Sequence, residues 1–186
     1  MLFADVGIPM ICVQMPVMVG ALIPVILLEA VLIRRWLGLS YVSAFRGVAL
    51  SNLGSTLIGV PIAWGIMFII ELGVLLPVSI AADHWHWQFR SPVFEVVGLF
   101  LSCAWLGPID QNQAWLVPAA AALLLIPSFY VSVWIERRIC IFSWKGSDPN
   151  AVRRCVYHAN LASYLMLFVL ACVWLGYEYF SRRSTP

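Results

Sequence analysis

Four long apolar stretches restrict what this chain can fold into. They cover residues 13–33, 48–70, 116–135 and 155–176, and a helix needs about 20 apolar residues to cross a bilayer. The 186 residues are 62% hydrophobic and 11% charged, with a mean hydropathy of +0.92. Soluble domains carry roughly twice this share of charged residues. The sequence therefore predicts an all-α integral membrane protein.

A fifth apolar stretch, residues 93–107, is harder to place. It is short for a crossing, carries Glu95 near its start and is followed by Pro108. A stretch of this length suits a re-entrant or interfacial segment. The distribution of basic residues helps to decide, because cytoplasmic loops of membrane proteins carry an excess of Lys and Arg.

Without a crossing at 93–107, and with the N-terminus outside, most basic residues fall on the cytoplasmic side. These are Arg34, Arg35, Arg46, Arg137, Arg138, Lys145, Arg153 and Arg154. With a crossing there, the cytoplasmic set shrinks to Arg34, Arg35, Arg46, Arg182 and Arg183. We therefore predict a four-helix transmembrane bundle with both termini outside and an outer-face insertion at 71–115. Five transmembrane helices are the alternative.

One pattern of charged and polar residues occurs twice. In each copy a proline lies ten residues before an Arg pair, and an asparagine lies six residues after a single Arg. The first copy contains Pro24, Arg34-Arg35, Arg46 and Asn52, and the second contains Pro127, Arg137-Arg138, Arg154 and Asn160. We therefore predict two parallel helical-hairpin repeats, at 13–70 and 116–180, within one membrane domain spanning 1–186.

Each copy also places polar side chains close to its basic residues. At 1.5 Å per residue, Glu29 lies about 7.5 Å along the helix from Arg34, and Asn52 lies about 9 Å beyond Arg46. Such polar groups within a span usually face the bundle interior. We predict a polar layer near the cytoplasmic face, made of Glu29, Arg46, Asn52, Ser55, Glu136, Arg154, Asn160 and Ser163.

The role of this layer has three readings from sequence. Glu29 can pair with Arg46 or accept from Asn52 and lock two helices together, it can be a solute or proton site, or it can be a catalytic carboxylate. Glu136 adjoins Arg137 and is expected about one turn nearer the interface, shallow enough for its side chain to reach polar surroundings. The structural lock is the preferred reading, and Glu29 is the residue for which a further role is expected.

Small residues and turn formers predict local structure. Ser51, Ser55, Gly59 and Ala63 are spaced by four and form a packing face that lets helix backbones approach closely, expected to contact the first or the last helix. Ser40 and Ser43 are candidate caps for the second helix. The run at 146–150 predicts a turn followed by a helix start.

The chain offers no pattern typical of a metal or cofactor site. His84 and His86 have only Asp83 beside them, and the alternation with tryptophans favours an interfacial segment. His158 has no histidine partner in another span, which argues against haem. The five cysteines contain no CxxC pair, and no nucleophile or phosphate-loop motif is present. No cofactor and no metal are expected.

The sequence thus predicts a multi-pass protein of the plasma or inner membrane with a structural or accessory role. Residues 1–8 lack Lys and Arg, so the first helix is expected to be retained and not cleaved as a signal peptide. A protomer of a small-solute or proton-coupled transporter and an intramembrane lipid-modifying enzyme are the alternatives, and catalysis is not favoured. The expected partners are the lipid bilayer and either a second copy or another membrane protein, and the net charge of +2 gives no reason to expect nucleic acid.

Overall fold

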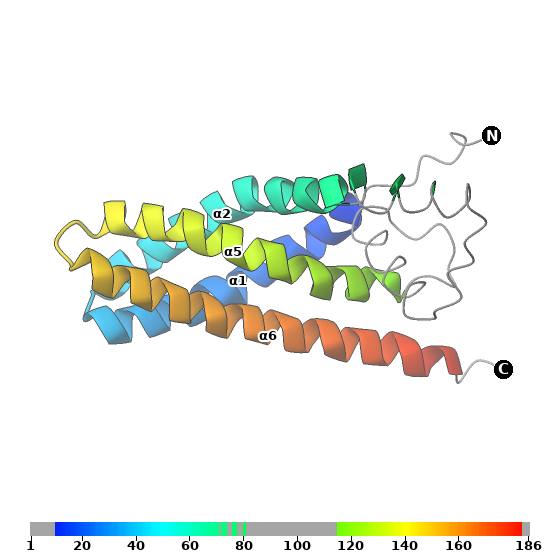
Figure 1. The fold of residues 1–186 in the computed structure, drawn as a ribbon. Coiled ribbons are helices and arrows are strands. Elements are labelled where there is room, and N and C mark those ends of the chain that lie inside the picture. Colours follow the sequence, from blue (N-terminus) through cyan, green and yellow to red (C-terminus); the bar gives the residue numbers. More distant parts are fainter. Residues whose placement is uncertain (1–9, 71, 74–75, 78–79, 81–114, 184–186) are drawn as a thin grey trace. The chain divides into compact units, whose positions relative to one another are not determined.

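Four long helices account for most of the chain that the computed structural model describes, which is residues 10–70, 72–73, 76–77, 80 and 115–183 (Figure 1). They are α1 (Met10–Leu37), α2 (Tyr41–Ile70), α5 (Leu116–Ser143) and α6 (Pro149–Arg183). All four are long and apolar enough to cross a membrane. The prediction of an all-helical protein with four such helices is confirmed.

The helices extend beyond the apolar stretches that predicted them. α1 continues through Arg34-Arg35 to Leu37, α5 continues through Arg137-Arg138 to Ser143, and α6 begins at Pro149. Hydropathy marks the part of a helix that tolerates lipid, whereas the backbone hydrogen bonds of a helix continue wherever the residues favour it. Arginine is a good helix former, so these arginines belong to the helices and not to the connections.

The helix ends follow the local sequence. Ser40 precedes α2, and its hydroxyl accepts from the Ser43 amide at 3.3 Å, as in an N-cap. Ser43 itself lies within the helix. Gly38 follows α1 with a φ of 65°, a left-handed conformation that glycine adopts without a Cβ penalty.

The start of α6 has a stronger cap. The two carboxylate oxygens of Asp148 accept from the amides of Asn150 and Ala151, each at 3.1 Å, and Pro149 occupies the first helical position, which proline favours. The predicted helix start within 146–150 therefore agrees with the structure.

The chain divides into two compact units. Unit 1 consists of residues 1–14, 64–124 and 171–186, and unit 2 consists of 15–63 and 125–170. In the described part of unit 1, Val117 and Ala120 form a small core with Trp115 and Trp174. All four helices contribute residues to unit 2, which contains every residue of the predicted polar layer.

Unit 2 has an apolar core at the end where its helices are connected. Trp144, which directly follows α5, is 5% exposed and packs among Ile33, Val48 and Val152. Its indole nitrogen donates to the Ser43 carbonyl at 3.3 Å. A side chain at Gly47 would meet the Trp144 ring, so α2 has a glycine where this ring lies.

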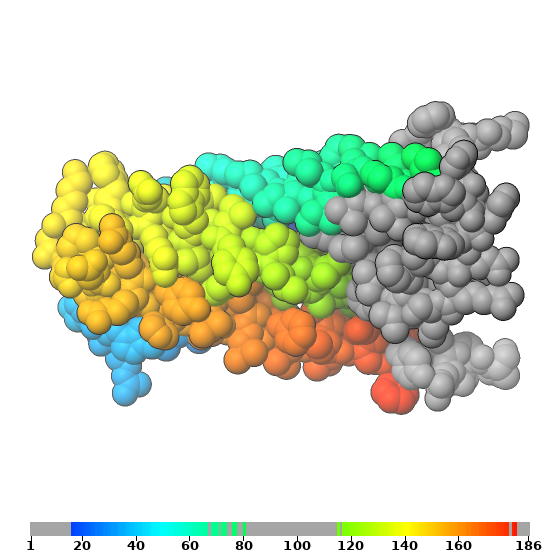
Figure 2. Space-filling model, in the orientation of Figure 1, coloured from blue at the N-terminus to red at the C-terminus, as the bar shows by residue number. Residues whose placement is uncertain are grey.

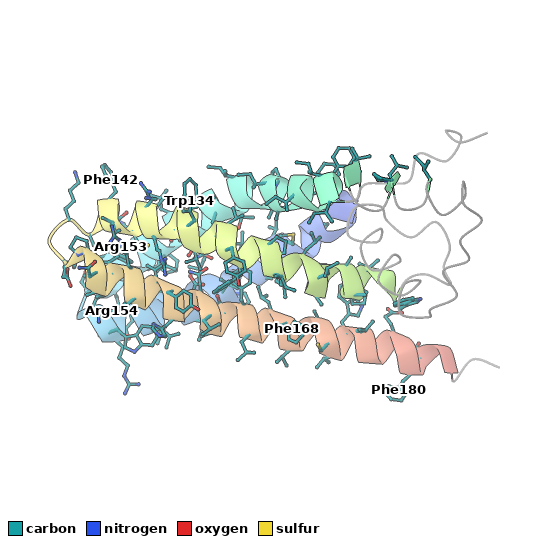
Figure 3. The ribbon with its side chains drawn as sticks, viewed as in Figure 1. Trp134, Phe142, Arg153, Arg154, Phe168 and Phe180 are labelled. Carbon is teal, nitrogen blue, oxygen red and sulfur yellow. The ribbon has the colours of Figure 1, made fainter. Side chains whose placement is uncertain are left out.

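The outer surface of unit 2 carries many exposed apolar side chains. Leu57, Trp134, Leu165 and Phe168 are exposed on α2, α5 and α6, and Figure 3 shows Trp134 and Phe168 projecting away from their helices. In the space-filling view, α5 and α6 lie against each other along unit 2 (Figure 2). A surface of this kind suits a lipid environment.

The small-residue face of α2 packs against α5. Ser51, Ser55, Gly59 and Ala63 are all buried, and a Cβ added at Gly59 would lie 3.4 Å from Val131 of α5. The prediction of a packing face therefore agrees with the structure, but the expected partner, the first or last helix, was wrong. Periodicity identifies the face of a helix and carries no information about which neighbour covers it.

The predicted outer-face insertion at 71–115 lies almost wholly outside the described residues. The placement of 93–107 and the surroundings of His84 and His86 therefore stay predictions.

Candidate functional site

Glu29 is a buried carboxyl group in the middle of unit 2. It lies on α1, is 1% exposed, and accepts two hydrogen bonds from two other helices. The Asn52 amide nitrogen of α2 donates to Oε2 at 2.7 Å, and the Ser163 hydroxyl of α6 donates to Oε1 at 2.5 Å. Each carboxyl oxygen of Glu29 thus has one donor.

Glu136 on α5 has the same kind of environment. It is 2% exposed, and it accepts from the Asn160 amide of α6 at 2.7 Å and from the Ser55 hydroxyl of α2 at 2.7 Å. Each of the two glutamates therefore has its asparagine on the next helix of the chain. If α1–α2 and α5–α6 are taken as two helix pairs, the serine of each glutamate lies on a helix of the other pair.

These contacts form a closed chain through all four helices. We call the six side chains the polar ring: Glu29, Asn52, Ser55, Glu136, Asn160 and Ser163. The hydrogen bonds join α1 to α2, α2 to α5, α5 to α6, and α6 back to α1. Each helix of unit 2 is thereby bonded to two others.

Helix geometry explains why the asparagines and serines act together. Ser55 follows Asn52 by three residues, and Ser163 follows Asn160 by three, so each pair lies on one face of its helix. The second amide hydrogen of each asparagine goes to the backbone carbonyl four residues earlier, Val48 or Val156, at 3.1 Å. Because a carbonyl only accepts, this contact also fixes which end of each carboxamide is nitrogen.

The serine hydroxyls have two acceptors within reach but one hydrogen each. Ser55 Oγ lies 2.7 Å from Glu136 and 3.1 Å from the backbone carbonyl of Asn52. Ser163 Oγ lies 2.5 Å from Glu29 and 3.0 Å from the backbone carbonyl of Asn160. The shorter contacts are those to the carboxyl groups. The serines therefore connect the helix pairs.

Two predicted members of the layer are not in it. Arg46 and Arg154 are exposed, although each lies only six residues before its asparagine. At 3.6 residues per turn, six residues rotate a side chain by about 120° away from the asparagine face. Of the two contacts expected for Glu29, the pairing with Arg46 is absent from the described structure, and the hydrogen bond from Asn52 is present.

The expected difference between the two glutamates is also wrong. Glu136 was predicted to lie shallow and reach outwards, but it is as buried as Glu29 and bonded in the same way. Its neighbour in sequence, Arg137, points elsewhere, with its guanidinium 5.4 Å from the Tyr157 ring centre. Arg34 of α1 behaves similarly and lies 3.6 Å from the ring centre of Tyr41.

A second polar contact near the ring escaped the sequence analysis. Ser132 of α5 and Tyr164 of α6 share a hydrogen bond of 2.8 Å between their hydroxyls. Ser132 is 7% exposed. The available signal was a serine within an apolar span, which in a membrane helix usually finds a partner on a neighbour.

The ring consists of hydrogen bonds from neutral donors to two carboxyl groups. In the part of the chain that the structure describes, the donors to the two carboxyl groups are two amides and two hydroxyls. No group of three or more His, Cys, Asp or Glu that could hold a metal ion occurs among the described residues. Burying polar groups is costly unless they are bonded, so each of these contacts restrains the helices that carry it.

Comparisons with known proteins identify no relative: the chain matches no protein-family model, no curated protein and no solved structure.

Proposed function

We propose that this chain is a structural or accessory membrane protein whose four helices are locked together by the polar ring. The observation that carries the proposal is the closed set of hydrogen bonds, in which each carboxyl group is held by one asparagine and one serine from different helices. A site that binds a substrate through hydrogen-bond donors needs a donor that is free to meet it. The donors of the ring are all directed at acceptors within the protein.

The same contacts support the proposal of two hairpin repeats. Each glutamate bonds to the asparagine of its own helix pair, and the serines three residues further on bond to the glutamate of the other pair. An exchange of equivalent contacts of this kind is expected where two copies of one unit pack together. The ring would then be the interface between the copies within a single membrane domain.

We further propose a multi-pass arrangement in the plasma or inner membrane, with the basic ends of the helices towards the cytoplasm. The support is the charge of the two connections and their adjoining turns. Arg153 and Arg154 lie at the connected end of α6 (Figure 3), and Asp148 is the one acidic residue between Arg137 and Arg154. The exposed apolar faces of unit 2 are then available to lipid and to a second copy or another membrane protein.

The lock can be tested through the two serines that connect the helix pairs. The S55A/S163A variant removes one donor from each carboxyl group and leaves both asparagine contacts. Interhelical hydrogen bonds in membranes contribute about 0.6 kcal/mol on average and up to about 1.7 kcal/mol. We expect the variant to unfold about 1–3 kcal/mol more easily, measured by sodium dodecyl sulfate titration in mixed micelles.

Ser51 provides the matched control. It is as buried as the other two serines, and its hydroxyl donates within α2 to the Val48 carbonyl at 3.0 Å. Its further polar contact is with the Cys140 thiol, a weak hydrogen-bonding group. S51A should therefore change stability by less than about 0.5 kcal/mol. Equal losses in S51A and in the double variant would show that the ring does not lock the helices.

A further inference from the structure

The polar ring has more acceptors than donors. Both amide hydrogens of Asn52 and both of Asn160 are used, and each serine has given its one hydrogen. The carboxamide oxygen of Asn160 has no hydrogen-bond partner, although the residue is completely buried. A buried acceptor without a partner is costly and rare. This oxygen belongs to the same carboxamide whose nitrogen lies 2.7 Å from Glu136, and that carboxamide is a member of the ring.

The ring also has more negative than positive charge. Glu29 and Glu136 belong to the same closed chain of hydrogen bonds, and their donors in the described structure are neutral amides and hydroxyls. The basic residues nearest in sequence are directed elsewhere, Arg34 to the Tyr41 ring and Arg137 to the Tyr157 ring. Charged groups within a membrane span are costly and are normally paired.

We propose that the polar ring binds one monovalent cation, a proton or a sodium ion, held by the carboxyl groups of Glu29 and Glu136 and the carboxamide oxygen of Asn160. The proposal rests on the proposed lock and adds a ligand to it. The groups of the ring that do not donate a hydrogen bond are carboxyl and carboxamide oxygens. Hard cations are bound by oxygens of these kinds. One bound cation reduces the excess of negative charge from two to one and supplies a partner for the Asn160 oxygen.

Two other titratable side chains face this site, and the experiment has to distinguish their titration from that of the two glutamates. Cys140 on α5 and Tyr164 on α6 both interact electrostatically with the two glutamates. Among the described residues of α1 and α2, the charged side chains nearest in sequence are Arg34, which stacks on Tyr41, and Arg46, which is exposed. The variants C140S and Y164F keep the shape of each side chain and remove its titration from the range of the experiment.

The test is the thermal stability of the full-length protein in detergent, measured through tryptophan fluorescence. The Tm is recorded from about pH 5 to about pH 9 and against sodium chloride, with choline chloride at equal ionic strength as the control. A sodium ion bound only by the folded protein raises the Tm by roughly 5–10 °C at a hundredfold excess over its Kd. A bound proton that is released on unfolding makes the Tm fall by several degrees as the pH rises.

The E29Q/E136Q variant distinguishes the ring from the rest of the protein. Glutamine keeps the size of glutamate and removes the charge, so the sodium or pH dependence of the wild type should be lost, whereas C140S and Y164F should retain it. An infrared carboxylic-acid band that is present in the wild type and absent from E29Q/E136Q identifies the cation as a proton. A sodium-dependent Tm without that band identifies sodium.

A wild-type Tm that responds neither to sodium over choline nor to pH overturns the proposal without any variant. If the double variant does not fold, the single variants E29Q and E136Q serve, and a dependence that both retain in full also overturns it. The lock is tested separately, because S55A/S163A is compared with S51A at one pH and one salt. A stable ring without cation dependence would leave the lock standing.

Discussion

The two helix pairs of unit 2, α1–α2 and α5–α6, reach the same contacts with different spacing. Glu29 lies 23 residues before Asn52, and Glu136 lies 24 residues before Asn160. The glutamates differ more in relation to the arginines, since Glu29 lies five residues before Arg34 and Glu136 directly precedes Arg137. The carboxyl–amide contact is therefore kept while the Arg pair moves by about one helical turn.

This difference shows which requirement is strict. A buried carboxyl group needs its donors within hydrogen-bonding distance, so a shift of one turn would break the contact. An arginine at the end of a membrane helix has a long side chain that adapts to its position, so the same shift is tolerated. The polar ring, and not the arginine pattern, is the feature that the two pairs share most closely.

The connected ends of the two pairs are less alike. Trp144 follows α5 and covers Gly47 of α2, whereas the residue at the corresponding place in α6, five before its asparagine, is the half-buried Cys155. Trp36 at the end of α1 instead makes an edge contact with His158, with ring centres 6.4 Å apart. The pairs thus agree at the ring and differ at the end of the core.

Truncation of each glutamate tests whether the two pairs are equivalent at the ring, and it should have the largest effect. E29A and E136A each leave an amide and a hydroxyl without their acceptor and open a small cavity, which costs about 2–4 kcal/mol. We expect equal losses, measured by unfolding in mixed micelles. E178A, at a half-buried position near the end of α6, is the control and should cost less than about 0.5 kcal/mol.

A loss at Glu29 that exceeds the loss at Glu136 by more than about 2 kcal/mol would contradict this equivalence. It would restore the sequence-based expectation that Glu29 alone has a special role.

Substitution at the connected end tests where the pairs differ. In G47A the new methyl group meets the Trp144 indole, which must move and lose its hydrogen bond to Ser43. Overpacking of this kind costs about 1–3 kcal/mol. C155A at the corresponding place should be close to neutral, and so should G20A, where a Cβ meets nothing within 4 Å.

Intrinsic Trp fluorescence of the folded protein offers a second measurement on the same variants, because only G47A displaces an indole. A neutral G47A would mean that the Trp144 contact does not restrain α2.

Sequence reasoning succeeded where a property is local. The four helices follow from hydropathy, and the cap at Ser40 and the helix start at Asp148 follow from residue type. All six residues of the polar ring were among the eight predicted, because polar groups within a span must find partners inside the protein. Arg46 and Arg154 were wrongly included, because their distance along the chain was considered and their direction around the helix was not.

The pairing within the ring required the fold. Whether Ser55 bonds to Glu29 or to Glu136 depends on how the pairs pack, and neither spacing nor periodicity carries that information. For the same reason the packing face of α2 was predicted correctly while its partner, α5, was not. The Ser132–Tyr164 contact was missed because each residue alone is common in membrane helices.

The helix caps provide the smallest and most local comparison between the pairs. Asp148 accepts from two backbone amides of α6 and places a negative charge at a helix N-terminus, whereas Ser40 accepts from one amide of α2 at a longer distance. Loss of a cap costs about 0.5–2 kcal/mol, and charge at this end of a helix adds to the effect.

We expect D148A to cost about 1–2 kcal/mol and S40A about half as much, with S147A, beside Asp148, as the neutral control. Hydrogen exchange should show faster opening confined to the first turn of the affected helix. Equal effects of D148A and S147A would mean that the Asp148 cap does not stabilise the start of α6, and the two pairs would then not differ in their caps.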